Sequence, residues 1–349
     1  MTPVTINLAL QGGGAHGAFT WGVLDRLLEE PWIEFEGITA TSAGAMNAAA
    51  LKGGYVKGGR KGAKVAMDEF WNGVSDLGTL VPEPVQDWLA SVTPPLPVLA
   101  QFAEWNPALA GANALTRLLS PYDLNPLDLH PLRSVVDELL DFGAICADTG
   151  PKLFIAATNV RSGKIRVFEG DEITTDAILA SACLPTLYQA VEVYDPKTDR
   201  IEAYWDGGYI GNPALFPLFY ATSTADILIV HINPTYREDL PRTARDIENR
   251  INEISFNSSL FRELRGIEFV QRLIERGQVS DGDMKYLNVH SLADDKTMTA
   301  LGVATKVTPT RGLLGQLKSA GQFAAEMFLT HHADDLGKRS SCDLRAMFS

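Results

Sequence analysis

Three short stretches of the chain carry residue types that could together perform acyl transfer. Four glycines and a histidine follow a short apolar run in Gly12-Gly-Gly-Ala-His-Gly17. A serine stands among small residues in Ala40-Thr-Ser-Ala-Gly44, and an aspartate opens Asp206-Gly-Gly208. A serine nucleophile needs a base that accepts its proton and N–H donors that hold the negative oxygen of the tetrahedral intermediate. The serine, the carboxylate and the glycine loop are candidates for these three parts.

The glycine loop by itself leaves three functions open. Gly12, Gly14 and Gly17 match the spacing G-x-G-x-x-G of dinucleotide-binding loops. That fingerprint also needs an acidic residue at the end of the second strand, whereas Glu34 and Glu36 fall at the start of the second strand expected here. No Gly-Lys-Ser/Thr closes the loop as in a P-loop. A nucleotide phosphate site, an anion cradle for a reaction intermediate and a plain tight turn therefore all remain.

The serine and aspartate motifs favour the catalytic interpretation when they are taken together. Ser42 falls on a strand-to-helix turn between small residues, as in a nucleophile elbow, although Ala40 replaces the first glycine of the usual G-x-S-x-G pattern. The alternative is that Ser42 only caps the following helix. Asp206 is followed by Gly207 and Gly208, which leave room for the carboxylate to approach another loop. The alternative for this motif is an ordinary turn.

A histidine is the usual base for a catalytic serine. In the chain order of α/β-hydrolases, serine is followed by an acid and then by histidine, so His231 and His290 would be the candidates. Both lie at or near the ends of apparent strands.

The elements around these motifs predict a parallel sheet with helices packed on its faces. We expect strands over Thr5–Leu10, Phe35–Thr39, Leu153–Thr158, Lys164–Phe168, Val191–Tyr194, Ile201–Tyr204 and Asp226–Ile232. We expect helices over Ala18–Glu30, Ser42–Leu51, Ala244–Gly277 and Leu313–Leu329. The loops at the carboxyl ends of parallel strands share one edge of the sheet, so the glycine loop and Ser42 are expected to face the same cleft.

Composition and charge limit the partners. The chain has 349 residues, 46% of them hydrophobic and 21% charged, and its net charge is −13. The negative charge argues against a nucleic-acid partner, which needs a basic surface. The amino-terminal stretch lacks the features of a signal peptide, and no apolar run approaches the roughly 20 residues of a membrane-spanning helix, so a cytoplasmic protein is expected. Three widely spaced cysteines indicate neither a disulfide framework nor a zinc site.

The three motifs resemble the three signatures of the patatin-like phospholipase family and occur in the family's order. Gly12–Gly17, Thr41–Gly44 and Asp206–Gly208 carry the resemblance. Further segments that resemble the family are Ala157-Thr158-Asn159, Ala180–Pro185 and Asn212-Pro213. The resemblance covers roughly residues 5–233, and the remainder is similar to bacterial members more loosely.

The resemblance implies an α/β/α sandwich with a mainly parallel central sheet and a Ser–Asp dyad without a catalytic histidine. Ser42 would be the nucleophile and Asp206 the base, and the N–H groups of Gly12, Gly13 and Gly14 would form the oxyanion hole. The implied reaction is hydrolysis of a lipid or fatty-acyl ester through an acyl-serine, with no cofactor or metal. Contact with a membrane would be peripheral and transient. An acyltransferase of similar topology and a catalytically silent lipid-binding member are the alternatives, and the oligomeric state is left open.

The motifs depart from the family pattern at two places. His16 stands where the family usually has arginine or lysine, and a histidine is only partly charged near neutral pH. Ala40 places one methyl group more beneath Ser42 than the usual glycine. Gly17 and Gly44 complete the motifs as supporting residues.

We expect one domain over residues 1–349, with a core over about 5–233 and a helical extension over 241–349 packed on it. A proline- and tryptophan-rich insertion over 80–132 is the candidate lid, in which Trp88, Phe102 and Trp105 would meet the acyl chain. The alternative is a surface elaboration whose aromatic residues pack on the core.

Overall fold

We describe the fold from a computed structural model, which places residues 2–77, 93–104, 119–280 and 282–348, with side chains throughout except at 102–104 and 245. The strands are β1 (Val4–Leu10), β2 (Ile33–Ala40), β3 (Lys152–Asn159), β4 (Ile165–Glu169), β5 (Val191–Asp195), β6 (Arg200–Asp206), β7 (Asp226–Val230) and β8 (Asn288–Leu292). The α-helices are α1 (Gly17–Leu27), α2 (Ala43–Asp76), α4 (Leu96–Glu104), α6 (Pro121–Leu124), α7 (Leu132–Leu139), α8 (Phe142–Ile145), α9 (Thr175–Ser181), α10 (Phe216–Ala221), α11 (Ala244–Glu275), α12 (Asp295–Thr299), α13 (Val303–Lys306), α14 (Arg311–His332) and α15 (Leu344–Met347). Short 3-10 turns are η1 (Gly14–His16), η2 (Gly170–Glu172) and η3 (Gly207–Tyr209).

The described strands form one sheet in the order β5-β6-β3-β2-β1-β7-β8, with β4 also paired to β3. The five strands from β3 through β2, β1 and β7 to β8 pair in parallel. The pairs β3–β4, β3–β6 and β5–β6 are antiparallel. The sheet is therefore mostly parallel, as the sequence predicted.

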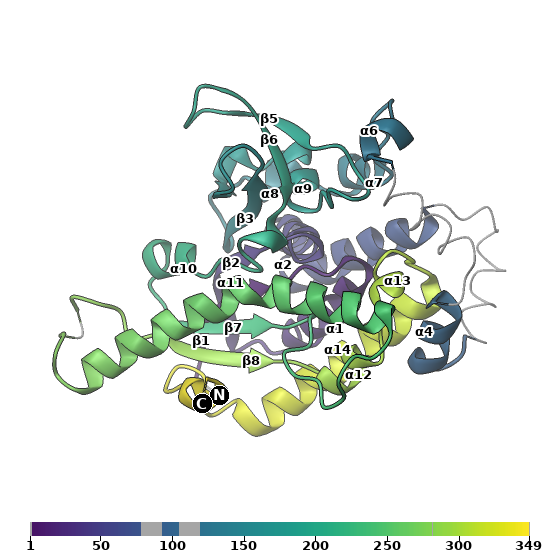
Figure 1. The fold of residues 1–349 in the computed structure, drawn as a ribbon. Coiled ribbons are helices and arrows are strands. Elements are labelled where there is room, and N and C mark those ends of the chain that lie inside the picture. Colours follow the sequence, from purple (N-terminus) through teal and green to yellow (C-terminus); the bar gives the residue numbers. More distant parts are fainter. Residues whose placement is uncertain (1, 78–92, 105–118, 281, 349) are drawn as a thin grey trace.

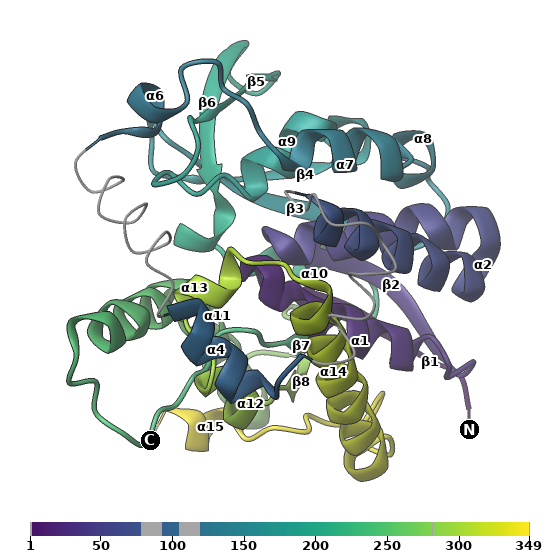
Figure 2. The same cartoon turned by 90° about the vertical axis from the view of Figure 1, so that its right-hand side faces the viewer.

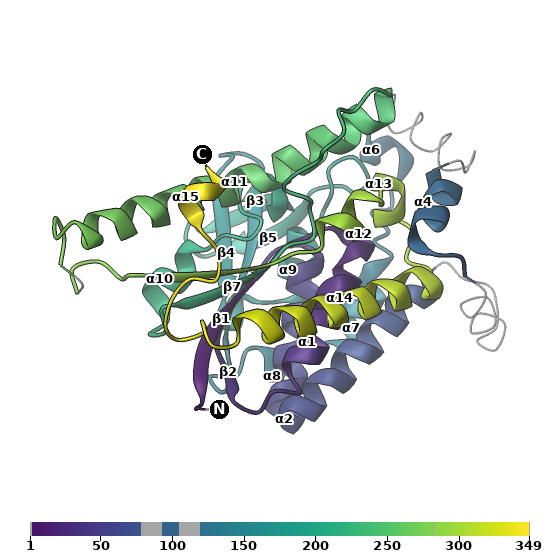
Figure 3. The same cartoon turned by 90° about the horizontal axis from the view of Figure 1, so that it is seen from below.

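Alternating side chains of the central strands build two apolar layers. Ile6, Leu8 and Leu10 of β1 pack with α1, α2 and α14 on one face of the sheet. Ala9 and Ile229 point to the other face, which α10 and α11 cover. Figures 1 and 3 show the long α11 on one side of the sheet and α1, α2 and α14 on the opposite side. The predicted α/β/α sandwich is confirmed.

The strand register along β3 brings the serine motif and the aspartate motif to the same edge of the sheet. Ala40, the last residue of β2, pairs with Ile155 of β3. Asp206, the last residue of β6, pairs with Ala157, two positions further along the same strand. Since β2 runs parallel and β6 antiparallel to β3, the two strands approach this point from opposite directions. The loops after Ala40 and Asp206 therefore meet at the carboxyl edge of the parallel sheet.

Two elements differ from the expected ones. The helix expected over Ser42–Leu51 continues to Asp76, with non-helical dihedral angles at Gly58 and Gly59. Burial of residues such as Phe70 on the core compensates for the low helix propensity of this glycine-rich run. The region from 241 onward is not entirely helical either, because β8 extends the central sheet beside β7.

Candidate active site

Ser42 has the backbone geometry of a nucleophile elbow. It lies between β2 and α2 with φ 55° and ψ −125°, a region that a residue with a side chain rarely adopts. Such a conformation costs on the order of 1–3 kcal/mol and persists only where the surroundings impose it. The Ser42 side chain makes no capping hydrogen bond to α2, so the helix-cap interpretation is wrong. A Cβ at Gly44 would collide with the carbonyl groups of Leu10 and Gln11, which explains why only glycine allows α2 to start here.

Asp206 combines a turn function with a free carboxylate oxygen. Its Oδ1 accepts the N–H of Gly208 at 2.7 Å, which closes the turn η3. Its Oδ2 is buried and has no hydrogen-bond partner among the described residues. The Ser42 hydroxyl approaches this carboxyl closely enough to lower its pKa, although it forms no hydrogen bond of standard distance and angle with it. One oxygen is thus held by the backbone, and the other is available to a proton from Ser42.

Burial controls the acidity of this carboxyl. It raises the pKa of Asp206 to about 6, against smaller opposing effects of the Gly208 N–H, the Ser42 hydroxyl and the positive charge of Lys306. The main chain of Asp206 is fixed as well, because its N–H donates to the Cys183 carbonyl at 2.8 Å. A carboxyl with a pKa near 6 is ionised at neutral pH but is a stronger base than an exposed aspartate.

Two contacts join the serine loop to the aspartate and glycine loops, and a third joins it to α9. The Thr41 hydroxyl donates to the Gly211 carbonyl at 2.7 Å, which joins the elbow to the loop that follows Asp206. The Ser42 N–H donates to the hydroxyl of Ser181 at 2.9 Å. A Cβ at Gly12 would lie 2.5 Å from Ser42 Cβ, so the glycine loop directly abuts the serine. The three motifs predicted from the sequence therefore lie together at one site.

The glycine loop offers fewer free donors than the sequence suggested. The Gly12 N–H donates to Asn212 Oδ1 at 2.7 Å and is already occupied. The N–H groups of Gly13 and Gly14 have no acceptor among the described residues. Gly14 adopts φ +59°, and a Cβ there would collide with the carbonyl of Lys306. The expected set of three donors is therefore reduced to Gly13 and Gly14 in this geometry.

His16 does not supply a charge to the loop. It is buried, and its Nε2 lies 2.7 Å from the Thr305 hydroxyl, which itself donates to the Gly302 carbonyl. The hydroxyl proton is thus used, so Nε2 carries the hydrogen and donates to Thr305. Burial, assisted by the positive charge of Lys306, lowers the pKa of His16 well below 6.5. Burial therefore favours the neutral ring, in contrast to the partial charge that a histidine suggests from the sequence.

Neither candidate histidine forms a hydrogen bond with Ser42 or Asp206. His290 Nε2 lies 2.9 Å from Asp226 at the amino end of β7, opposite the edge that carries Ser42. His231 is buried without a hydrogen-bond partner among the described residues, and burial lowers its pKa to about 4. The dinucleotide interpretation lacks support as well: Glu36 is used at the amino side of β2, where it accepts the N–H groups of Ser223 and Thr224.

A buried polar network behind the glycine loop was not identified from the sequence. Gln11 Oε1 accepts the N–H groups of Ile232 and Asn233, and its Nε2 donates to Asn257 Oδ1 at 2.9 Å. Asn233 Nδ2 donates to the Gly12 carbonyl at 2.9 Å. Gln11 directly precedes the glycine loop, and this position could have indicated from the sequence that it belongs near the site. Asn233 and Asn257 gave no such indication, because they come close to the loop only in the folded chain.

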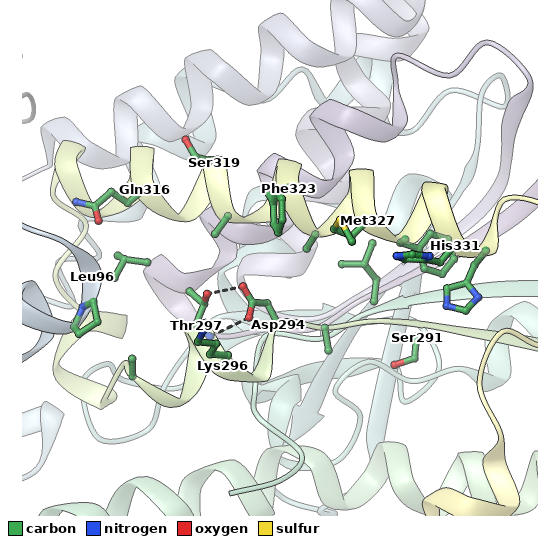
Figure 4. A pocket seen from close by; sticks show the side chains of 18 residues that line it. Leu96, Ser291, Asp294, Lys296, Thr297, Gln316, Ser319, Phe323, Met327 and His331 are labelled. Atoms are coloured by element: carbon green, nitrogen blue, oxygen red, sulfur yellow. Dashed lines mark hydrogen bonds between the residues drawn. The ribbon is translucent and has the colours of Figure 1, made fainter.

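Only part of the insertion over 80–132, the candidate lid, lies within the described residues. Trp88 and Trp105 lie outside the described residues, and so does the side chain of Phe102. Helix α4, which contains Phe102, lies beside α13 and α14 (Figure 2). A cavity of about 930 Å³ lies between α4, α14, β8 and α12, and its lining does not include Ser42 or Asp206. Figure 4 shows its lining, in which Phe323 and Met327 face Asp294 and Thr297.

Among the described residues, no group of three or more His, Cys, Asp and Glu side chains could hold a metal ion. In the same part of the chain, no helix combines the length and the apolar character needed to cross a membrane.

The site therefore consists of three motif loops at the carboxyl edge of a mostly parallel α/β/α sandwich. A family model described as Patatin-like phospholipase matches residues 8–221, which is well over half of the chain. The protein belongs to the patatin-like phospholipase family. Membership supports lipid acyl hydrolysis in general terms.

A comparison with solved structures matched the crystal structure of VipD from Legionella pneumophila. It shares 15% sequence identity with this chain, and the comparison covers 91% of this chain and 67% of VipD at a TM-score of 0.37. No curated protein matches the chain.

Proposed function

We propose that the protein is a serine lipid acyl hydrolase that cleaves carboxylic esters with a Ser42–Asp206 dyad. One observation carries the proposal: a serine in the strained elbow conformation lies close to the carboxyl of Asp206, one oxygen of which is buried without a hydrogen-bond partner among the described residues. An unsatisfied buried oxygen costs free energy, so its presence in a native structure needs an explanation, and a catalytic role is one. The substrate would be a phospholipid, a lysophospholipid or a simpler fatty-acyl ester.

The dyad would act in two half-reactions. Asp206 Oδ2 accepts the proton of Ser42 Oγ while Oγ attacks the acyl carbon, and the carbonyl oxygen becomes negative. The N–H groups of Gly13 and Gly14, at the start of η1 and α1, stabilise this oxygen with help from the helix dipole. Asp206 then returns the proton to the leaving alcohol. In the second half, Asp206 takes a proton from water, the hydroxide attacks the acyl-serine, and the fatty acid leaves as Ser42 regains its proton.

Covalent labelling with a fluorophosphonate tests the proposal and its pH dependence together. Labelling requires ionised Asp206, and burial raises the pKa of this carboxyl to about 6. The labelling rate should therefore be constant between about pH 6.5 and 7.5 and fall about tenfold for each unit below pH 6. Mass spectrometry of the digested protein should locate the adduct on Ser42.

Other outcomes separate the alternatives. A protein that forms no adduct at any pH would be a silent lipid-binding member. An adduct at Ser42 combined with acyl transfer to added alcohols in preference to water would indicate an acyltransferase. A rate that does not change between pH 4.5 and 7 would contradict Asp206 as the base. Esters of increasing chain length, compared with intact phospholipids, would then define the substrate.

Exposed apolar side chains between Tyr122 and Leu129 support peripheral membrane contact. Leu127 and Leu129 are 79% and 67% exposed, and Tyr122 is exposed beside them. Their segment is tied to the loop before β5, where Gln189 Nε2 donates to the Asn125 carbonyl at 2.8 Å. The Tyr122 hydroxyl of α6 accepts the N–H of Ala190 just before β5, and Figure 2 shows α6 near β5 and β6, the hairpin that ends at Asp206. This part of the molecule could therefore rest on a lipid surface while the site receives its substrate.

The double substitution Leu127→Gln with Leu129→Gln is expected to weaken binding to phosphatidylcholine vesicles about tenfold or more, because two large apolar side chains no longer leave water. Co-sedimentation measures the binding, and hydrolysis of a short soluble ester should be unchanged. Tyr220→Gln is the control, since Tyr220 is equally exposed on α10. Equal binding of the double variant and wild type would argue against this patch.

A further inference from the structure

The helix α13 brings a lysine from the C-terminal region to the glycine loop. The carbonyl of Lys306 occupies the space next to Gly14, and its neighbour Thr305 accepts the hydrogen bond from His16. Both ends of the turn η1 thus rest on α13. Neither residue belongs to the three sequence motifs.

The ammonium group of Lys306 is held by neutral groups. Nζ donates to Asn233 Oδ1 at 2.8 Å and to Asn252 Oδ1 at 3.3 Å, and it lies 5.7 Å from the centre of the Phe256 ring. No carboxylate forms an ion pair with it in the part of the chain that the structure describes. Its positive charge is therefore not cancelled by a direct partner.

The charged and titratable groups that face Lys306 come from four other elements. Asp206 and Glu253 attract it, Arg237 repels it, and His16 is neutral. Glu253 is already paired with Arg237, at 2.9 Å between Nε and Oε2, and with Arg250 at 3.1 Å. Asp206, in contrast, has no ionic partner of its own among the described residues. The dyad carboxylate is thus the unpaired negative charge in this neighbourhood.

Two short chains of contacts connect Lys306 with both halves of the site. Asn233, which accepts from Nζ, donates through Nδ2 to the Gly12 carbonyl at 2.9 Å. Phe256, under the ammonium, packs against Gly208, whose N–H holds Asp206 Oδ1. The lysine is therefore coupled to the glycine loop on one side and to the base on the other.

We propose that Lys306 is the electrostatic positioning residue of the dyad and supplies the positive charge that His16 does not supply from within the glycine loop. The proposal rests on the proposed Ser42–Asp206 chemistry. The charge favours the ionised form of Asp206 in the free enzyme and the negative oxygen in the tetrahedral intermediate. Lys306 does not contact the reacting atoms. Its positive charge acts on them through the electrostatic potential at the glycine loop.

The titration of Lys306 adds a second consequence. Burial lowers its pKa to about 8, partly opposed by the negative charges of Glu253 and Asp206. Above pH 8 the ammonium loses its proton and its charge. The rate should therefore rise through about pH 6, as Asp206 ionises, and fall through about pH 8.

The test compares Lys306→Met, Lys306→Gln and Lys306→Arg with wild type by fluorophosphonate labelling between pH 4.5 and 9.5. Met and Gln should lower the maximal rate about tenfold, move the acidic limb upward by up to about one pH unit, and remove the limb near pH 8. Arg retains the charge at all these pH values, so its acidic limb should stay near that of wild type while its alkaline limb disappears. Unfolding curves show which variants are folded. Lys285→Met is the matched control, because Lys285 is also partly buried with a lowered pKa but donates to the Thr222 carbonyl, away from the site.

A second measurement does not depend on activity. In a Ser42→Ala background, the carboxyl ¹³C resonance of Asp206, assigned with Asp206→Asn, reports the pKa of this group directly. It should titrate higher when Lys306 is replaced by Met or Gln than when it is retained. If the pKa of Asp206 and the pH profile of labelling are both unchanged in folded Lys306 variants, the proposal for Lys306 is overturned, whereas the proposed Ser42–Asp206 chemistry is not affected. If wild type forms no adduct, the proposed function fails, and the NMR titration still decides whether Lys306 sets the charge of Asp206.

Discussion

Replacing Ser42 with alanine is expected to lower ester hydrolysis at least about 10³-fold and to abolish the fluorophosphonate adduct. The hydroxyl is the only group of the proposed mechanism that forms a covalent bond, and removal of a catalytic serine in hydrolases costs up to about 10⁶-fold. Stability should change little, because alanine keeps the same unfavourable φ of 55°. Hydrolysis of a soluble ester, adduct mass and an unfolding curve on one preparation measure all three quantities.

Two further variants make this result specific. Ser42→Gly also removes the hydroxyl, but it should be about 1 kcal/mol more stable than Ser42→Ala, because glycine adopts a positive φ without strain. Ser319→Ala removes a hydroxyl on α14 that donates to the Gly315 carbonyl, and its activity should equal that of wild type. An adduct that persists in Ser42→Ala would show that another residue is the nucleophile.

Replacing Asp206 with asparagine should cause a similar loss of activity and, at the same time, stabilise the protein. Asparagine can still accept the Gly208 N–H through Oδ1, so the turn is kept, but it cannot take the serine proton. We expect kcat to fall by about 10³–10⁴-fold. The buried, unpaired Oδ2 becomes an amide that can donate to Ser42 Oγ, and this removes an uncompensated charge from the interior.

The gain in stability should depend on pH in a defined direction. Burial raises the pKa of Asp206 from 3.8 to about 6, so the folded state binds the proton more tightly than the unfolded state. The wild type therefore loses stability as pH rises from about 4 to 6, by on the order of 2–3 kcal/mol, and the loss is complete above pH 6. Asp206→Asn should accordingly be more stable than wild type at pH 7 and nearly equal to it at pH 4. Urea unfolding at both pH values measures the difference, and a variant less stable than wild type at pH 7 would contradict an ionised, unpaired Asp206.

The local signals that the sequence carries strongly were the ones predicted correctly. Apolar runs such as Thr5–Leu10 and Asp226–Ile232 predict buried strands because parallel strands are covered on both faces. The succession of strand, glycine loop and helix predicts a parallel sheet, since each helix must cross back over the sheet before the next strand begins. The mostly parallel sheet with helices packed on its faces follows from these local patterns. An apparent strand was noted at His290, but its pairing with β7 in the central sheet was not predicted, and neither was the kinked length of α2. Tertiary burial decided both.

The partners of the site depend on contacts between segments far apart in the chain. Asn212 occupies the Gly12 N–H, and Thr305 binds His16, across 200 and 289 positions of sequence. A local sequence pattern cannot predict these long-range contacts. The presence of a histidine in the sequence also does not predict whether its ring will be buried and neutral. The partial charge that the sequence suggested for His16 is therefore disfavoured in the folded chain, where Lys306 of α13 lies next to the glycine loop.

The sequence alone determined which residues could react, because small neighbours, a serine on a turn and an aspartate before two glycines are local requirements of acyl transfer. It also determined the mostly parallel sheet that exposes these loops at one edge. Only the tertiary structure decided the strained angle of Ser42, the free oxygen of Asp206 and the loss of Gly12 as a donor. These properties arise from packing and from the removal of water around the loops. Both depend on segments that meet only when the chain is folded.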